Sequence, residues 1–525
     1  MAPPRTAEAA PFEAEAGSQP SRHSREVGLS RCTKTLRQAA VHFSIVTEDS
    51  ETLHKQLAYP ALPSPLLAQL KAPRRGRERE QDMDRNGPSV GSDVPMAPGM
   101  SERFTSPFAP LALAPEVAAE LEALAQAFVS RSIATYEQFL LDDGSKVDES
   151  QWKFMYEKEN VRSYVERSGV ASAGAGAAAG GAWDKRAAMY SDTPASALPV
   201  ILVVGTIVGD LDDTIYGFLC PTLDQMRVKT SYVKDNLVRG SVLASLVAPS
   251  EAQPFRSMTI KWMEKGQPVH VRAVIKNRDF VYMEATGVEY LRNGERVGYQ
   301  LVHSVQFPET PARASAIRGN MSMCALYRQK DNQVTDVFIK GFLNPAGGLV
   351  RSIITRSAAR ALLSVSKNVY CSRMKKIMWA VRQRHRAASR DGSRGGLCPE
   401  DPTVDEPCVG CAKKPSASSS LLAAAASRMN YSAKHIRRRR RCKLCGRYVC
   451  SDCRELHKLT FILPDHRLMQ HQIALCAGCQ ETALDVKAGD VARDEQSVGL
   501  MSLFEWHDAY ATSSGSELVM IDELN

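Results

Sequence analysis

The chain lacks the segments that would carry it through or into a membrane. Its first 17 residues have no basic stretch followed by an apolar one, which a secretory signal requires. No apolar run approaches the roughly 20 residues of a membrane-spanning helix, and the longest, at 197–208, is typical of a buried strand. We therefore expect a cytoplasmic protein in a reducing compartment, with only peripheral membrane contact.

Catalytic motifs are missing as well. The sequence contains no Gly-x-Ser-x-Gly nucleophile elbow, no phosphate-binding loop and no zinc site with an open coordination position. We therefore expect a protein that is not an enzyme. The net charge of +9 is modest for 525 residues, so a charged partner must be recognised by a local concentration of charge. We expect no nucleic-acid partner.

Composition divides the chain into five parts. Residues 1–100 are rich in Pro, Ala, Ser and charge and poor in aromatics, so they cannot bury a core and are expected to be disordered. The four parts that follow are a central domain at 101–390, a linker at 391–405, a cysteine-rich module at 406–485 and a polar tail at 486–525.

Eight of the 13 cysteines form four Cys-x-x-Cys pairs near the C-terminus. A two-residue gap lets two thiolates bind one tetrahedral metal from a single tight turn, and four sulfur ligands usually bind zinc. In a reducing compartment such pairs favour metal over disulfides. The pairs therefore predict two structural Zn²⁺ ions, held by Cys408, Cys411, Cys442, Cys445, Cys450, Cys453, Cys476 and Cys479.

The central domain is predicted to be α+β. A helical face runs from Val117 to Phe128, and a buried strand follows near 200–208. Apolar alternation and turn residues then predict an antiparallel meander, with strands at 255–263, 269–276, 279–291, 297–307, 321–328 and 334–340. One long amphipathic helix should follow Gly348. Such a helix, gripped by a curled sheet, encloses either a packed core or an apolar cavity.

Three motifs give this domain a resemblance to the START (steroidogenic-acute-regulatory-related lipid transfer) family. They are Leu211-Asp212-Asp213 with Tyr216-Gly217, then Asn277–Tyr282, and then Lys340–Gly348. The resemblance implies a helix-grip fold that holds one lipid or sterol. Four polar strand residues could orient a head group, although strand alternation favours a solvent-facing position for each: Arg272, Glu284, His303 and Arg328.

The cysteine-rich module resembles a FYVE-type zinc finger. That family binds two zinc ions in cross-brace order, with its first and third cysteine pairs on one ion and its second and fourth on the other. The resemblance implies one site at Cys408, Cys411, Cys450 and Cys453, and another at Cys442, Cys445, Cys476 and Cys479. It also implies a small cross-brace finger beside the helix-grip domain.

A basic run abuts the second cysteine pair, with eight Lys or Arg and no acid from Lys434 to Arg447. The FYVE family binds phosphatidylinositol 3-phosphate through a motif that aligns with Arg438, Arg439, Arg440, Arg441 and Lys443. Here arginines replace both family histidines, and Ala474 replaces a later family arginine. Arginine forks suit phosphate, and each basic group near an anionic leaflet contributes about 1 kcal/mol.

These features predict a peripheral membrane protein that binds lipid in its central domain and anionic phosphoinositide through its finger. Endosomal or other membranes would be its location. The alternative is a protein-interaction finger on a START-like scaffold, either a small-GTPase effector or a RING-type ubiquitin ligase. RING modules typically include a histidine ligand and lack an arginine run, whereas all eight ligands here are cysteines.

Overall fold

The structure is a computed structural model that describes residues 106–167, 200–235, 237–266, 276–344, 346–347, 351–390, 406–414, 441–462, 468–498 and 519–520. The chain divides at residue 88, and all of these residues belong to the second unit. Four expected features lie outside the described residues: the disordered region 1–100, most of the strand at 269–276, the linker 391–405 and the arginines at 438–440.

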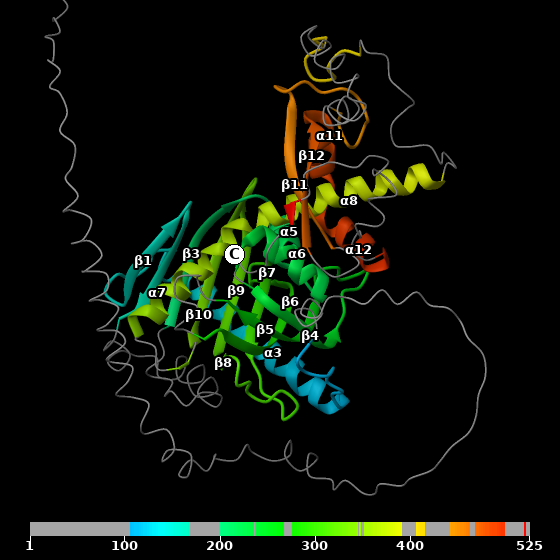
Figure 1. Ribbon diagram of the computed structural model, residues 1–525. Coiled ribbons are helices and arrows are strands. Elements are labelled where there is room, and N and C mark those ends of the chain that lie inside the picture. Colours follow the sequence, from blue (N-terminus) through cyan, green and yellow to red (C-terminus); the bar gives the residue numbers. More distant parts are fainter. Residues whose placement is uncertain are drawn as a thin grey trace, which may run out of the picture. The chain divides into compact units, whose positions relative to one another are not determined.

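Ten strands of the central domain form one sheet (Figure 1). They are β1 Trp152–Lys158, β2 Val161–Glu166, β3 Val200–Val208, β4 Leu237–Val247, β5 Ser257–Lys265, β6 Arg278–Tyr290, β7 Arg296–Ser304, β8 Ile317–Arg318, β9 Asn320–Asp331 and β10 Val334–Asn344. Their order is β1-β2-β3-β10-β9-β7-β6-β5-β4, and β8 pairs with β6. Every pairing is antiparallel except β6 with the short β8.

The antiparallel meander is confirmed, and β3, β5, β6, β7, β9 and β10 match expected strands within a few residues. The strands β1, β2 and β4 and the short β8 were not predicted. Strand β1 lies at the edge of the sheet and none of its residues is fully buried, so its sequence shows no clear apolar alternation. A half-exposed edge strand leaves a weak sequence signal.

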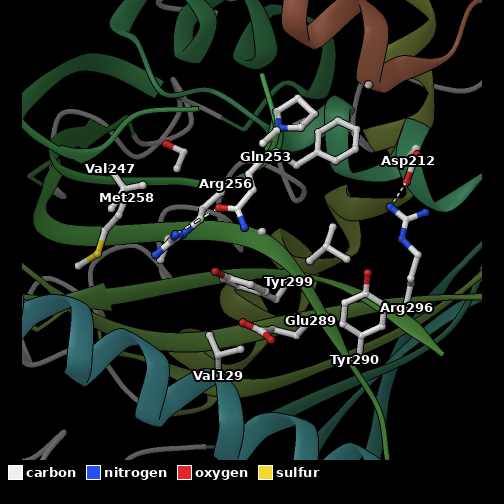
Figure 2. Close-up of a pocket in the computed structure, with 18 of the residues that line it drawn as sticks. Val129, Asp212, Val247, Gln253, Arg256, Met258, Glu289, Tyr290, Arg296 and Tyr299 are labelled. Atoms are coloured by element: carbon white, nitrogen blue, oxygen red, sulfur yellow. Dashed lines mark hydrogen bonds and ion pairs between the residues drawn. The ribbon is translucent and has the colours of Figure 1, made fainter. Parts of the chain in front are cut away.

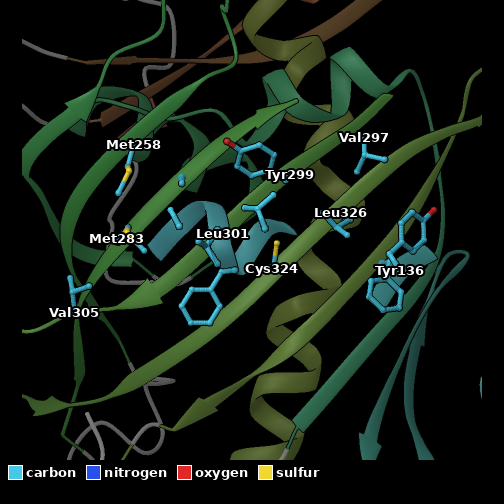
Figure 3. Packing of buried hydrophobic residues seen from close by; sticks show 14 of the residues in the cluster. Tyr136, Met258, Met283, Val297, Tyr299, Leu301, Val305, Cys324 and Leu326 are labelled. Atoms are coloured by element: carbon cyan, nitrogen blue, oxygen red, sulfur yellow. The ribbon is translucent and has the colours of Figure 1, made fainter. Parts of the chain in front are cut away.

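One sheet face is covered by α3 (Pro115–Leu141), and we call it the α3 face. Phe128 and Tyr136 of α3 belong to a buried cluster with Met283, Leu301 and Leu326, whose side chains rise from neighbouring strands (Figure 3). The helical face expected from 117 to 128 is therefore confirmed. Burial of this helical face against the sheet forms the larger of the domain's two main apolar clusters.

The opposite face, which we call the grip face, is covered by α5 (Leu211–Phe218), α7 (Arg351–Leu362) and α8 (Asn368–Arg390). Ile215, Ala358 and Val369 pack there with Val203 and Ile339 of the sheet. The fold class, α+β with a large antiparallel sheet and a long helix, is confirmed.

The final helix is not continuous, in contrast to the expectation from its periodicity. A 3₁₀ segment at Leu363–Lys367 (η4) separates α7 from α8. Ser364 and Ser366 favour this break because serine hydroxyls compete for backbone hydrogen bonds. The break also ends where α5 approaches most closely: a Cβ on Gly217 would lie 1.9 Å from the Asn368 carbonyl oxygen.

The cysteine-rich module contains β11 (Arg454–Ile462), β12 (Leu468–Cys476) and α11 (Ala477–Asp485), and β13 (Val519–Met520) pairs with β12. A further helix, α12 (Ala488–Val498), lies in the region expected to be a polar tail. Its Asp494 accepts a 2.8 Å hydrogen bond from Trp379 Nε1 of α8. The five domain boundaries remain predictions.

Candidate functional site

The structure brings the eight paired cysteines into two groups of four. Cys408 and Cys411 meet Cys450 and Cys453, while Cys442 and Cys445 meet Cys476 and Cys479. Within each group the sulfur atoms all lie within 4.8 Å of one another. The grouping is the one that the cross-brace order implies.

Short turns position each pair of sulfur atoms. In the first turn, Ala412 N–H donates to Cys408 O at 2.8 Å, and a Cβ on Gly410 would lie 3.1 Å from Cys453 Sγ. In the second, Gly446 N–H donates to Cys442 O at 2.9 Å, and Gly446 adopts φ of 74°. A side chain at either glycine would disturb the sulfur positions.

The sulfur spacing fits zinc. Four ligands at a Zn–S distance of about 2.3 Å in a tetrahedron stand about 3.8 Å apart. The Cys411 and Cys450 sulfurs are 3.7 Å apart, and those of Cys445 and Cys476 are 4.0 Å apart. Each cluster is therefore able to hold one zinc ion, which would tie together segments distant in the chain.

Backbone amides favour thiolates at two of these positions. Burial acts to raise the pKa of Cys408, but amides of Cys450, Cys411 and Gly410 outweigh it and lower the pKa to about 6. Cys450 N–H, for example, lies 3.3 Å from Cys408 Sγ. Burial is likewise outweighed at Cys445, where hydrogen bonds led by the Arg447 amide lower the pKa to about 7. Thiolates are the form that binds zinc.

The basic motif is only partly described. Arg438, Arg439 and Arg440 lie outside the described residues. The backbone of Arg441 forms an isolated antiparallel β-bridge with Tyr448. The Arg441 guanidinium donates to Gly446 O at 2.6 Å and forms an ion pair with Glu406 at 3.1 Å. The Lys443 amide donates to Ala474 O at 2.9 Å, so Lys443 lies beside the alanine that replaces a family arginine. Arg441 thus helps to hold the second cysteine turn.

The finger shares a hydrophobic cluster with the central domain, which sequence reasoning missed. Leu459 and Phe461 of β11 are buried in one cluster with Met374 and Ile377 of α8 and Tyr232 of α6 (Leu223–Val233). Polar contacts join the same elements: Thr460 N–H donates to Tyr232 Oη at 2.8 Å, and Lys376 Nζ donates to Leu484 O at 2.8 Å. The finger is docked on the helices of the central domain.

A charged pair is buried on the grip face. Lys261 Nζ pairs with Glu284 and also donates to Cys220 O at 2.6 Å; the two charged side chains are 1% and 7% exposed. Gln300 Nε2 donates to the other Glu284 oxygen at 2.6 Å. Burial acts to raise the Glu284 pKa, but the charges of Lys261 and Lys229 outweigh it and lower the pKa.

Beside this pair lies an apolar group that is not fully covered. Phe280, Tyr282 and Met321 are buried there, while four further members are only partly buried: Met263, Val302, Met323 and Leu343. All of these residues lie on the strands β5, β6, β7, β9 and β10. We call them the inner apolar cluster. The grip face therefore carries incompletely covered apolar side chains next to a buried charged pair.

The other head-group candidates lie elsewhere. His303 contacts Phe128 of α3, with ring centroids 4.5 Å apart, and burial lowers its pKa to about 4. Arg328 also faces α3, where it donates to Tyr136 Oη at 3.2 Å. Arg272 lies outside the described residues. Of the four candidates, only Glu284 is placed on the grip face by the described contacts.

A cleft of about 790 Å³ opens between α3, the sheet and the start of α12 (Figure 2). Its charges largely pair with one another: Arg296 with Asp212 at 2.9 Å, and Arg256 with Glu122 at 2.5 Å. This cleft therefore offers little unbalanced charge to a ligand. None of the described helices combines the length and hydropathy needed to cross a bilayer.

No protein-family model matches the sequence, and no curated protein matches it either. Solved structures show similarity. Human StAR-related lipid transfer protein 5 is 14% identical over 47% of this chain and 98% of its own, with a TM-score of 0.30. Human STARD10 is 13% identical over 45% of this chain and 79% of its own, with a TM-score of 0.29. The human StarD13 (DLC2) lipid transfer and protein localization domain is 10% identical over 42% of this chain and 88% of its own. Its TM-score is also 0.29. At these scores the likeness carries no argument about function, which rests on the side chains of this chain.

Proposed function

We propose that this chain is a non-enzymatic peripheral membrane protein that binds one lipid or sterol and is directed to its membrane by a zinc finger. The lipid would lie between the grip face and the α7–α8 helices, as the START resemblance implies. The observation that carries this proposal is the inner apolar cluster beside the buried pair of Lys261 and Glu284.

The chemistry of that interior suits an amphipathic ligand. The inner apolar cluster would cover an acyl chain or sterol ring, because each buried CH₂ group contributes about 0.8 kcal/mol. The pair of Lys261 and Glu284 stands where a hydroxyl or head group could exchange hydrogen bonds. Gln300 and Cys220 O already satisfy part of its hydrogen-bonding capacity, which limits the cost of burying two charges.

Native mass spectrometry of the full chain tests lipid binding. We expect a co-purified lipid or stoichiometric uptake of an added sterol or phospholipid. Met323→Trp would fill space in the inner apolar cluster and reduce uptake, whereas Tyr290→Trp, at a side chain that is 63% exposed, should leave it unchanged. A chain that carries no lipid and takes up none would overturn the proposal.

We further propose that the finger is FYVE-type, holds two Zn²⁺ ions and binds an anionic phosphoinositide membrane such as that of an endosome. The site would comprise Arg438, Arg439, Arg440, Arg441 and Lys443. Flotation of the full chain with phosphatidylcholine vesicles, with and without phosphatidylinositol 3-phosphate, tests this. We expect binding only with the anionic lipid and its loss on replacing Arg438, Arg439 and Arg440 with alanine.

One observation favours the alternative of a protein-interaction finger. Arg441 is already paired with Glu406 and Gly446 O, so its fork has less capacity for phosphate. If vesicles are not bound, pulldown with small GTPases and an autoubiquitination assay separate the effector from the ubiquitin ligase. Either activity without vesicle binding would replace the membrane-targeting role.

A further inference from the structure

A second cleft, of about 520 Å³, lies where the finger meets the central domain. Its walls come from α6, η4, α8, the β1–β2 turn and the end of β3 in the central domain, and from β11 and β12 in the finger. We call it the junction cleft. Its volume falls within the roughly 300–1,000 Å³ that small-ligand sites occupy.

The junction cleft is strongly basic. Four of its lining residues are cationic and come from separate segments: Lys234 just after α6, Lys367 in η4, Arg373 in α8 and Lys458 in β11. The one acidic lining residue, Glu159, accepts a hydrogen bond from Ser366 Oγ at 3.4 Å. Among the described residues, Lys234, Arg373 and Lys458 have no ion-pair partner. Cations held together without a counter-charge repel one another, and a bound anion removes that cost.

Lys367 is the least exposed of the four cations that line the cleft. Its Nζ donates to Val233 O at 3.1 Å, which holds the ammonium group in place. Burial lowers its pKa, and the neighbouring charges of Lys158 and Lys234 lower it further, with Glu159 only partly opposing them. The site therefore presents positive charge that the protein itself does not balance.

The rest of the cleft is lined by polar and aromatic side chains together with Val208 and Val369. Tyr370 is 46% exposed, and its ring packs edge-on against Tyr232 with centroids 6.1 Å apart. Ser231 Oγ lies 2.8 Å from Thr460 Oγ1, and Gln470 Nε2 donates to the same oxygen at 3.2 Å. Of these contacts, the one between Ser231 and Thr460 joins α6 to the finger, so both walls of the cleft are held together without a ligand.

We propose that the junction cleft binds a small ligand carrying several phosphate groups on a polyol ring, namely an inositol phosphate, free or as a lipid head group. Lysine and arginine from separate elements would each contact a phosphate oxygen. The half-exposed Tyr370 ring would cover the apolar face of the polyol. This site is distinct from the basic run at 438–443 and does not depend on the proposed membrane role of that run.

Titration calorimetry of the zinc-loaded full chain with inositol hexakisphosphate tests the proposal, and inorganic phosphate serves as a weak probe. The variant Arg373→Gln with Lys458→Gln removes one cation from each side of the cleft. We expect binding to weaken by about tenfold for each lost contact, because a hydrogen bond between charged groups contributes at least that factor. The matched control replaces Lys146 and Lys330 with glutamine, because these two exposed lysines lie outside both the cleft and the basic run and their loss removes the same charge.

The outcomes separate the possibilities. Weakening in the cleft variant but not in the control supports the site, provided that both melt at the wild-type temperature. If the double variant is destabilised, the variant Lys234→Gln, at the residue that follows α6, is used in its place. Vesicles containing phosphatidylinositol 3-phosphate then distinguish the source: vesicle binding that depends on the cleft indicates a lipid head group, and binding of the soluble probe alone indicates a free inositol phosphate. Equal binding by wild type and cleft variant, or no binding at all, overturns the proposal.

Discussion

The docking of the finger on α6 can be tested by removing a single hydroxyl oxygen, that of Tyr232. Strand β11 lies at the edge of its sheet, so its outward amides have no strand partner. The outward amide of Thr460 is instead satisfied by Tyr232 Oη, 2.8 Å away and 228 residues distant in the chain. Tyr232→Phe removes that acceptor and leaves a buried amide without its partner.

The cost follows from the desolvation of that amide, about 1–3 kcal/mol when a buried donor loses its acceptor. This corresponds to roughly 5- to 150-fold in an equilibrium constant. Hydrogen exchange measured by mass spectrometry should show faster exchange of the 454–462 peptide by a factor in that range. Melting of the full chain should also occur at a lower temperature.

Tyr370→Phe is the matched control, because its ring packs beside Tyr232 but is 46% exposed. We expect this variant to exchange at the wild-type rate. If Tyr232→Phe and Tyr370→Phe behave alike, the finger does not rest on α6 as described, and the junction cleft would lose its frame as well.

Three further outcomes follow from the packing. Cys408→Ser should lower the zinc content from two ions to one by elemental analysis, and metal chelation should unfold the finger, since structural zinc contributes folding free energy. Gly217→Ala should lower the free energy of unfolding by about 1–3 kcal/mol or more, whereas Gly478→Ala, with no atom within 4 Å of the new Cβ, should change it little in denaturant titrations. Lys261→Met should cost about 3–5 kcal/mol because it leaves Glu284 buried and unpaired. In wild type the Glu284 pKa is lowered on folding, so its stabilisation is complete above the ordinary value of 4.5 and is lost as pH falls through the folded value. Thermal melts between acid and neutral pH should show this loss, and it should vanish in the Lys261→Met variant.

Local patterns predicted the features that depend on neighbours in the chain. A two-residue gap between cysteines suffices to place two sulfurs on one turn, so the zinc ligands were readable as pairs. Strands that are buried on both faces, such as β6 and β9, were readable because runs of apolar and β-prone residues stand between turn residues. The edge strand β1 and the 3₁₀ break at Leu363–Lys367 were not, because their sequences carry only weak local signals.

Spacing alone could therefore establish that the chain has paired metal ligands, an antiparallel α+β domain and a concentrated basic run. The fold was needed to show which distant groups meet. Only tertiary packing joins Lys261 to Glu284 on the grip face, Tyr232 to Thr460 between α6 and the finger, and cations from four separate segments around one cleft. The physical reason is that hydrophobic burial and electrostatics act between side chains in space, and their partners leave no periodicity along the chain.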